Sequence, residues 1–347
     1  MDILTYFKQA IEKNASDLHL AGGSIPALRI GGYLDKLGKE IINPGDLRIA
    51  IKSLVDKKVW ERFKHERELN FSQEFFSTRF RINLHFQEGK IGLSARVIPG
   101  TIPDPKSLGF DEVIYNLTHL NDGLVLVTGP SGSGKSTTLA SMIDIINRER
   151  RAHIITIEDP IEYLFKEKQS IIEQRELGRD TKTFAIALKN ALRQDPNVIM
   201  VGEMRDYETV SAALTAAETG HLVLSTLHTT TAPETIGRII DVFPSHKQQQ
   251  VLVQLSSTLR AVIAQQILPA KNKERIVARE ILINNNAISN LIRNNKIDQI
   301  YSVIQTCRKE GMITMNKAID NLFEEGLINE SVARNRIRDL ETKISYY

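Results

Sequence analysis

The sequence has a single cysteine and no long apolar run, and each absence excludes a class of protein. Because Cys307 is the only cysteine among 347 residues, the chain forms neither an internal disulfide nor a zinc site built from several cysteines. No stretch approaches the roughly 20 apolar residues of a membrane-spanning helix, and no basic flank with an apolar signal core opens the chain. We therefore expect a cytoplasmic protein without direct membrane insertion, which reaches a membrane only through a partner.

An excess of charge of one sign is also missing. Lys and Arg number 45 against 42 Asp and Glu, and a net charge of +3 gives little support for a protein that binds polyanions. Apolar residues make up 41% and charged residues 25%, which is typical of a folded soluble protein. A chain of this length favours two domains, since cores split every ~100 to 200 residues.

The first part of the chain is predicted to be a small α+β domain. Apolar residues fall on one face of a helix over residues 3–13, and strand-like runs follow at 27–30 and 92–98. The helix face consists of Ile3, Leu4, Phe7 and Ile11.

The middle of the chain has four apolar runs separated by segments long enough for helices, which predicts a parallel α/β sheet. The runs are 124–127, 154–157, 198–201 and 222–224. Helices are predicted at 184–192 and at about 206–220, the latter with Asp206 as its N-cap. Each run ends in polar residues, and ligands of open α/β sheets bind beyond the carboxyl ends of the strands, so these four ends should converge.

Two prolines separate these regions. Pro103 and Pro105 interrupt all periodicity, because proline lacks a backbone donor and restricts the residue before it. We therefore expect an N-terminal domain at 1–100, a linker at 101–112 and a second domain at 113–284. The remainder, 285–347, is predicted to be a helical C-terminal region.

A glycine-rich loop follows the first apolar run. Gly129, Gly134, Lys135 and Ser136 satisfy the spacing G-x-x-x-x-G-K-[ST], between a strand-like run and a predicted helix at 137–146. Glycines let the backbone N–H groups point inward, and the helix start adds partial positive charge, so the loop is predicted to bind the phosphates of ATP. Lys135 should reach the β and γ phosphates, and Ser136 should ligate Mg²⁺. The predicted nucleotide-binding residues are Gly129, Pro130, Ser131, Gly132, Ser133, Gly134, Lys135, Ser136 and Thr137.

Two carboxylates and one histidine end the other apolar runs. Glu203 follows the third run and is assigned to Mg²⁺ through water, while Glu158 ends the second run and is assigned to activating the attacking water. The residues alone also permit the reverse assignment. His228 ends the fourth run and is predicted to sense the γ phosphate. His221 begins that run, where a hydrogen bond to neighbouring backbone explains it equally well.

Four ordered boxes in this chain resemble the secretion ATPases of type II secretion and type IV pili. Besides the glycine loop, residues 156–163 resemble the family's Asp box, 201–206 its Walker B segment and 219–229 its His box. Residues 15–20 resemble the start of its PAS-like domain. The resemblance covers nearly the whole chain. It implies a RecA-like parallel-sheet P-loop ATPase domain preceded by a small PAS-like α+β domain.

Within that family, the tail resembles the pilus retraction ATPases. Residues 287–294 agree with their segment AIRNLIRE at six of eight positions, with Ser289 and Asn294 in place of Arg and Glu. Extension ATPases of the family usually carry a longer N-terminal region and a four-cysteine metal site, and this chain has neither. We therefore expect a motor that drives pilus retraction.

The resemblance also implies an assembly. It implies a homohexamer in which Arg81 and Arg96 approach the ATP of a neighbouring subunit and stabilise transition-state charge. From the residues alone, both arginines are also explained as strand-surface side chains in weak ion pairs. The implied partners are a pilus platform protein of the inner membrane, at whose cytoplasmic face the ring works, and other pilus ATPases.

Other functions compete with retraction. Within the family, the chain could be an accessory retraction ATPase or an assembly ATPase of a pilus or type II secretion system. A nucleic-acid translocase is disfavoured by the near-neutral charge and the lack of a basic, aromatic-rich stretch, so no nucleic-acid partner is expected. A non-catalytic nucleotide-binding regulator is disfavoured because both candidate carboxylates are present.

Overall fold

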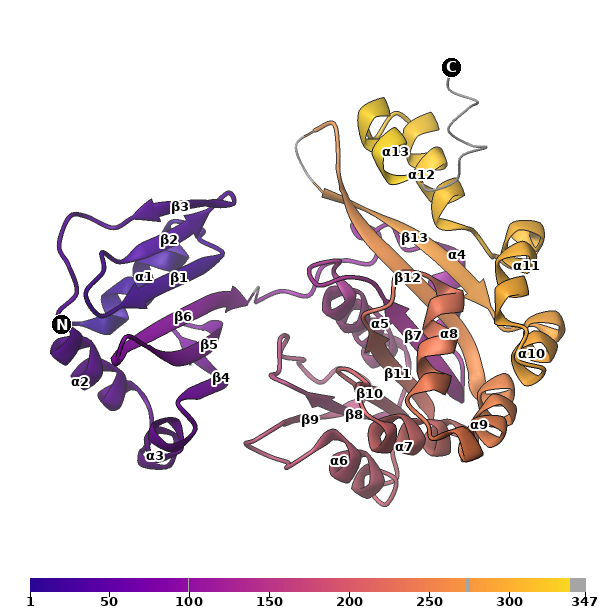
Figure 1. Ribbon diagram of the computed structural model, residues 1–347, viewed down its shortest axis with the longest axis horizontal. Helices are drawn as coiled ribbons and strands as arrows, with labels where there is room; N and C mark the ends of the chain where they lie inside the picture. The colour runs from indigo at the N-terminus through magenta and orange to yellow at the C-terminus, as the bar shows by residue number, and fades with distance from the viewer. Residues whose placement is uncertain (99, 273–274, 338–347) are drawn as a thin grey trace. The chain divides into compact units, whose positions relative to one another are not determined.

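The computed structural model describes residues 1–98, 100–272 and 275–337 (Figure 1). The chain divides into two compact units. The first comprises Met1–Thr101 together with the short segment Pro160–Leu164, and the second comprises Ile102–Asp159 and the chain from Phe165 onward. Part of the predicted helical C-terminal region, 338–347, lies outside the described residues.

The first unit is built on a six-stranded antiparallel sheet in the order β3-β2-β1-β6-β5-β4 (Figure 1). Its strands are β1 Asp17–Ala21, β2 Ala27–Ile30, β3 Tyr33–Lys36, β4 Glu68–Phe75, β5 Thr78–Gln87 and β6 Lys90–Ile98. Its helices are α1 Ile3–Glu12, α2 Pro44–Leu54 and α3 Lys57–Glu66. The α+β character predicted for this part of the chain is confirmed.

One face of this sheet packs against the three helices. Alternate residues of β5, such as Phe80 and Ile82, are fully buried in a core shared with Phe7 of α1. Leu4, predicted to share that helix face, is 39% exposed, because α1 turns Ile3, Phe7 and Ala10 inward instead. The opposite sheet face carries the alternating polar residues of β5 and β6, which include both candidate arginines.

The second unit contains a seven-stranded sheet in the order β13-β12-β7-β11-β10-β8-β9 (Figure 1). The four predicted runs are its central parallel strands. Its strands are β7 Gly123–Thr128, β8 His153–Glu158, β9 Ile171–Glu176, β10 Val198–Val201, β11 Leu222–Leu227, β12 Leu259–Pro269 and β13 Arg275–Ile283. Three strands were not predicted: β9, which is polar, and the antiparallel pair β12 and β13.

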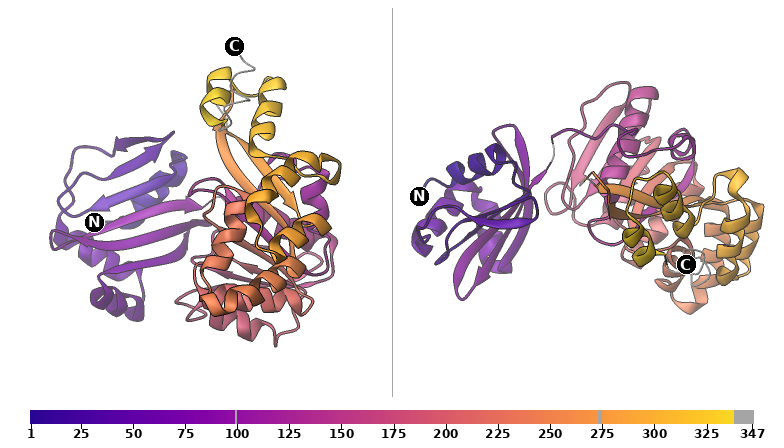
Figure 2. Two further views of the ribbon diagram at one scale, coloured as in Figure 1. Left: turned by 45° about the vertical axis from the view of Figure 1, so that its right-hand side comes forward. Right: turned by 90° about the horizontal axis from the view of Figure 1, so that it is seen from above.

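Helices cover both faces of this sheet (Figure 2). Successive residues of β7 enter opposite cores: Leu124 and Leu126 pack in the core of α6 to α11, whereas Val125 and Val127 pack in the core of α4 and α5. The helices are α4 Glu112–Leu117, α5 Lys135–Glu149, α6 Phe184–Ala191, α7 Tyr207–Glu218, α8 Ala232–Asp241, α9 Ser245–Thr258, α10 Asn286–Arg293, α11 Ile300–Thr306, α12 Met315–Glu324 and α13 Glu330–Arg336. Single turns of 3-10 helix lie at Ile297–Gln299 and Arg308–Glu310. Burial on both faces explains why the parallel strands read as continuous apolar runs.

The last helices form a smaller core with the β12–β13 pair. Ile319 of α12 and Ile328 pack against Leu268 of β12 and Ala278 of β13, and α12 lies along β13 (Figure 1). The helical character predicted from residue 285 is therefore present up to residue 337. The helices from α12 onward pack directly on strands β12 and β13 of the seven-stranded sheet.

Candidate nucleotide-binding site

The glycine-rich loop connects the buried strand β7 to the start of α5. Gly129 and Gly134 have φ angles of 144° and 85°, which side-chain-bearing residues rarely adopt. A Cβ atom at Gly129 would collide with the backbone of β12 at Gln265. Helices α6, α7 and α8 are each capped by a side chain, but in the described chain no side chain caps α5, whose N-cap is Gly134. The first N–H groups of α5 are therefore arranged to receive an anion.

The side chains of the loop fit a phosphate chain. The Lys135 ammonium donates to the backbone oxygens of Gly129 at 2.8 Å and Pro130 at 3.1 Å, so it lies across the loop. The Ser136 hydroxyl belongs to an exposed residue at the helix start. The buried Ser133 hydroxyl has no hydrogen-bond partner among the described residues. The loop therefore brings several hydrogen-bond donors close together: the Lys135 ammonium, the Ser133 hydroxyl and the first N–H groups of α5. Phosphate oxygens require such a cluster of donors.

Gln265 of β12 connects the glycine loop to the start of α5 through side-chain hydrogen bonds. The sequence did not predict this residue as part of the site. Its amide donates to the backbone oxygen of Ser133 at 2.6 Å and accepts from the Thr138 hydroxyl at 3.0 Å. The side chain is fully buried. A glutamine directly after the four buried apolar residues 261–264 is the one sequence signal that could have identified it.

The two predicted carboxylates end neighbouring parallel strands. Glu158 is the last residue of β8, is 6% exposed, and accepts from the Thr156 hydroxyl at 2.7 Å and the Gln174 amide at 3.2 Å. Glu203 follows β10, and its side chain is 20% exposed. The carboxyl edge of the sheet therefore presents one carboxylate held by two neutral donors and one more open to solvent.

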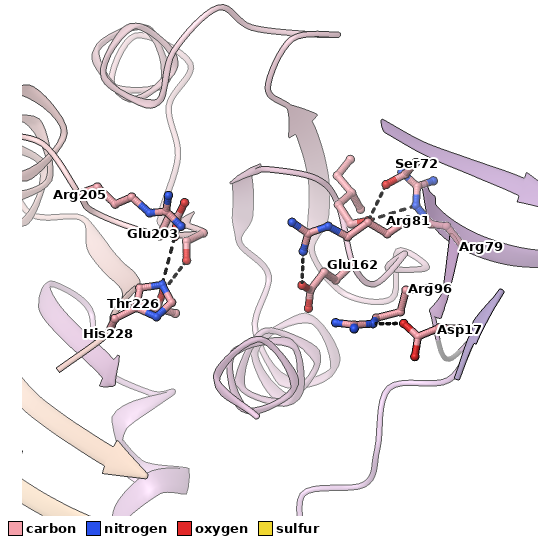
Figure 3. A network of polar contacts seen from close by, with 12 residues as sticks. Asp17, Ser72, Arg79, Arg81, Arg96, Glu162, Glu203, Arg205, Thr226 and His228 are labelled. Atoms are coloured by element: carbon pink, nitrogen blue, oxygen red, sulfur yellow. Dashed lines mark hydrogen bonds and ion pairs between the residues drawn. The ribbon is translucent and has the colours of Figure 1, made fainter. Parts of the chain in front are cut away.

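Glu203 lies beside two cationic or protonatable side chains (Figure 3). One carboxylate oxygen is 2.8 Å from the Arg205 guanidinium and 3.4 Å from Nε2 of His228. The end of β11 is fixed to the end of β10, since the Thr226 hydroxyl donates to the backbone oxygen of Gly202 at 2.6 Å. The structure thus brings Glu203 and His228 together. Arg205, the second partner of Glu203 in this cluster, was not predicted.

His221 lies at the opposite end of β11 from His228. Its Nδ1 is 3.0 Å from the backbone oxygen of Ala216 and 3.2 Å from the Thr219 hydroxyl. These local contacts match the backbone role considered for it from the sequence.

The two candidate arginines are cross-strand neighbours in the first unit. Arg81 of β5 pairs directly with Arg96 of β6, so both lie on the polar face of the antiparallel sheet. The Arg96 Nε donates to Asp17 of β1 at 2.9 Å, and the Arg81 guanidinium is 3.5 Å from Glu162 (Figure 3). The Arg96 side chain stays 66% exposed, so its terminal nitrogens remain accessible.

Asp17 is adapted to hold that arginine. Burial by itself raises the pKa of this carboxyl, but hydrogen bonds from the Ser16 hydroxyl and from Arg96 outweigh burial and place the pKa below the ordinary 3.8. The carboxylate is therefore ionised at neutral pH and fixes the near end of the Arg96 guanidinium.

The segment Pro160–Leu164, part of the predicted Asp box, packs on the same sheet face of the first unit. The backbone oxygen of Ile161 accepts from the Ser72 hydroxyl at 3.3 Å and from the Arg79 Nε at 3.2 Å (Figure 3). Arg81 and Glu162 extend this contact. The box therefore presents Glu158 at the sheet of the second unit and binds β4 and β5 through the residues that follow.

The tail segment forms α10. Ile288 and Ile292 are fully buried, and the Ser289 hydroxyl donates to the backbone oxygen of Ser256 in α9 at 2.8 Å. Asn294 bonds locally to Asn290. The two departures from AIRNLIRE thus leave the apolar face of the segment intact, and Ser289 ties α10 to α9.

No cluster of three or more His, Cys, Asp or Glu with metal-binding geometry occurs in residues 1–98, 100–272 and 275–337. Mg²⁺ is commonly held by one or two protein groups together with phosphates and water, so the exposed Ser136 hydroxyl and the Glu203 carboxylate fit such a site.

The family model described as "Type II/IV secretion system protein" matches residues 110–339. The chain belongs to that family. It is 42% identical to the type IV pilus retraction ATPase PilT of Pseudomonas aeruginosa over 97% of this chain and 98% of that protein. It is 36% identical to the type IV pilus ATPase PilU of the same organism, over 94% of this chain and 86% of that protein.

A solved relative shares the whole architecture of this family member. The crystal structure of the pilus retraction motor PilT with bound ADP superposes with a TM-score of 0.91 at 47% identity, covering 99% of this chain and 98% of that one. The predicted family, the α/β fold with its parallel-sheet ATPase domain, and the assignment as an ATP hydrolase are confirmed. Within the described parts of the chain, none of the helices has the length and apolarity to cross a bilayer.

Proposed function

We propose that this chain is the ATP-hydrolysing subunit of a motor that retracts type IV pili. The observation that carries ATP hydrolysis is the convergence of the uncapped start of α5, Glu158, Glu203 and His228 at the carboxyl edge of one parallel sheet. The similarity to PilT over nearly the whole length of both chains supports retraction as the use of that energy.

Each residue at this edge has a distinct task. The N–H groups of the glycine loop and the Lys135 ammonium bind the β and γ phosphates and neutralise their charge. The Ser136 hydroxyl and, through water, the Glu203 carboxylate would hold Mg²⁺, which would supply positive charge to the phosphate oxygens. Glu158 orients the attacking water and accepts its proton, and His228, tied to Glu203, faces the γ phosphate.

The environment of Glu158 supports its assignment as the base. Two of its neighbours, the Thr156 hydroxyl and the Gln174 amide, are neutral donors that hold the carboxylate at the end of β8. Glu203 instead lies against Arg205 and His228, and these contacts suit its proposed role at the Mg²⁺ site rather than the role of base. These contacts favour the arrangement proposed here over the exchanged one.

Separating nucleotide binding from turnover tests both roles. Glu158→Gln should keep ATP affinity and lose hydrolysis by at least about a hundredfold, the range of a missing general base. Glu203→Gln should also weaken the Mg²⁺ dependence of turnover. Normal turnover in Glu158→Gln would reject it as the base, and a changed Mg²⁺ requirement in that variant alone would exchange the roles.

We further propose that six copies form a ring at the cytoplasmic face of the inner membrane. Arg81 and Arg96 then complete the ATP site of a neighbouring subunit, and their exposed side chains support this role. The ring acts on the pilus platform protein and works beside other pilus ATPases. The segment at 101–112, with Pro103 and Pro105, provides the joint on which the N-terminal domain moves.

A further inference from the structure

Glu280 of β13 is a buried carboxylate shared by the starts of two helices. It is 1% exposed. One oxygen accepts from the backbone N–H of Ala232, the first residue of α8, at 2.7 Å. The other accepts from the N–H of Met315, the first residue of α12, at 3.3 Å. A single side chain thus receives one donor from α8, the helix that follows the predicted His box, and one donor from α12 in the C-terminal region.

Neither helix needs Glu280 as its ordinary cap. Thr231 caps α8 by accepting from the N–H of Glu234, and Thr314 caps α12 by accepting from the N–H of Lys317. Each helix start therefore has its own threonine, and Glu280 supplies an additional acceptor common to both. The shared acceptor ties the position of one helix start to that of the other.

The α8 end of this link reaches the nucleotide loop through buried hydroxyls. The Thr235 hydroxyl of α8 donates to the backbone oxygen of Thr231 at 2.7 Å, and it lies 2.7 Å from the Thr229 hydroxyl and 3.4 Å from the Thr128 hydroxyl. Thr128 is the last residue of β7, immediately before the glycine loop, and Thr229 follows His228. All three threonines are buried. These contacts place the end of β7 and the residue after His228 beside the start of α8.

We infer that Glu280 is the positioning residue that transmits the state of the nucleotide site to the C-terminal helices. In this route Glu280 acts through α8. This inference rests on the proposed ATPase function and adds the route by which its energy reaches the tail. Contiguity alone does not demonstrate coupling, so the test must measure a nucleotide-dependent change at α12.

Hydrogen exchange of the full-length assembled protein, with and without ADP, provides that measurement. In the wild type, ADP should slow exchange of the α12 amides at residues 316–324. Glu280→Gln has one acceptor oxygen in place of two and presents an NH₂ group to one of the two N–H donors. The variant should bind ADP and lose the ADP-dependent protection of α12.

A matched pair of variants at the other end keeps the test valid if Glu280→Gln does not fold. Met315→Pro removes the Met315 N–H that reaches Glu280 and is compatible with the helix, because proline is favoured at the first position of a helix and Thr314 has the extended backbone that must precede it. Met315→Ala truncates the same side chain and keeps the N–H. The proline variant should lose the ADP-dependent protection, and the alanine variant should keep it.

Nucleotide affinity, measured in parallel with a fluorescent ADP analogue, separates the possible failures. Absence of ADP binding in the wild type would overturn the proposed function and this inference together. Normal binding without a change at α12 would overturn the inference alone. Full ADP-dependent protection in both Glu280→Gln and Met315→Pro would do the same.

Discussion

At the scale of single residues, the phosphate-binding loop depends on a glutamine from a distant strand. Gln265 satisfies both the Ser133 backbone oxygen and the Thr138 hydroxyl in a fully buried position. Replacing it by leucine leaves those two groups without partners, and the loop is then free to leave its phosphate-binding shape.

Gln265→Leu should therefore weaken ADP binding roughly tenfold, the equivalent of one lost buried hydrogen bond of about 1.4 kcal/mol. Calorimetric titration with ADP measures the change. The same substitution at the adjacent Gln266, which does not bond to the loop, is the control. Equal affinities of Gln265→Leu and the wild type would show that the loop keeps its shape without the glutamine.

His19 gives the first unit a pH-dependent stability. Burial is the largest cause that lowers its pKa below the ordinary 6.5; Asp17 opposes it, and nearby Arg29 and Arg96 add to it. The unfolded chain therefore takes up this proton at a higher pH than the folded chain. Its contribution to stability is complete above pH 6.5 and is lost as the pH falls below 6.5 toward the folded pKa.

Between about pH 7.5 and about pH 5.5, His19→Gln should lose less unfolding free energy than the wild type. Urea unfolding at several pH values provides the comparison, with the exposed His65→Gln as control. A pH dependence that is the same in His19→Gln and the wild type would remove His19 as its source.

At this scale, the sequence predicted site residues that lie next to a recognisable local pattern, but not residues whose partners are distant in the chain. The glycine loop, Glu158, Glu203 and His228 each follow an apolar run, so local sequence located them. Gln265 and Glu280 act on partners 35 or more residues away, and only the order of the strands brings those partners together.

At the scale of elements, helix starts and buried parallel strands were predicted well. Asp206 caps α7 as expected, accepting from the N–H and the hydroxyl of Thr209, both at 2.8 Å. The edge strand β9 escaped prediction because its last four residues, 173–176, are all polar, which is typical of a surface segment. The β12–β13 pair escaped because its pairing joins the far side of β7, a contact that no local pattern encodes.

Asp206→Ala should lower the free energy of unfolding by about 1 kcal/mol, the usual cost of a lost N-cap. Urea unfolding measures the difference. Asn329→Ala is a matched control, because Asn329 occupies the N-cap of α13 without a side-chain cap hydrogen bond. Equal losses in the two variants would mean that the Asp206 hydrogen bonds contribute nothing to stability.

At the scale of the whole molecule, the grouping of Pro160–Leu164 with the first unit could not be predicted. Its nearest neighbours in sequence belong to the second unit, and its contacts with Ser72 and Arg79 span more than 80 residues. The proposed completion of an ATP site by a second subunit likewise leaves no periodic signal, and Arg81 and Arg96 could be singled out only through a family resemblance.

Mixed rings test that completion. Arg81→Ala subunits keep their own glycine loop, and Lys135→Ala subunits keep Arg81, so a mixture should hydrolyse ATP faster than either variant alone. Steady-state turnover across mixing ratios gives the result. Turnover that is only the sum of the two inactive variants, with no depression of wild-type subunits by Arg81→Ala, would place the arginine outside the neighbouring site.

The central claim is that ATP hydrolysis by this chain retracts pili, and the pilus phenotype of cells lacking the gene tests it most directly. The account predicts cells that carry an excess of surface pili and do not move by twitching. The wild-type gene should restore retraction, and a Lys135→Ala gene should not. Bald cells would contradict the account, because they would show that this ATPase builds pili.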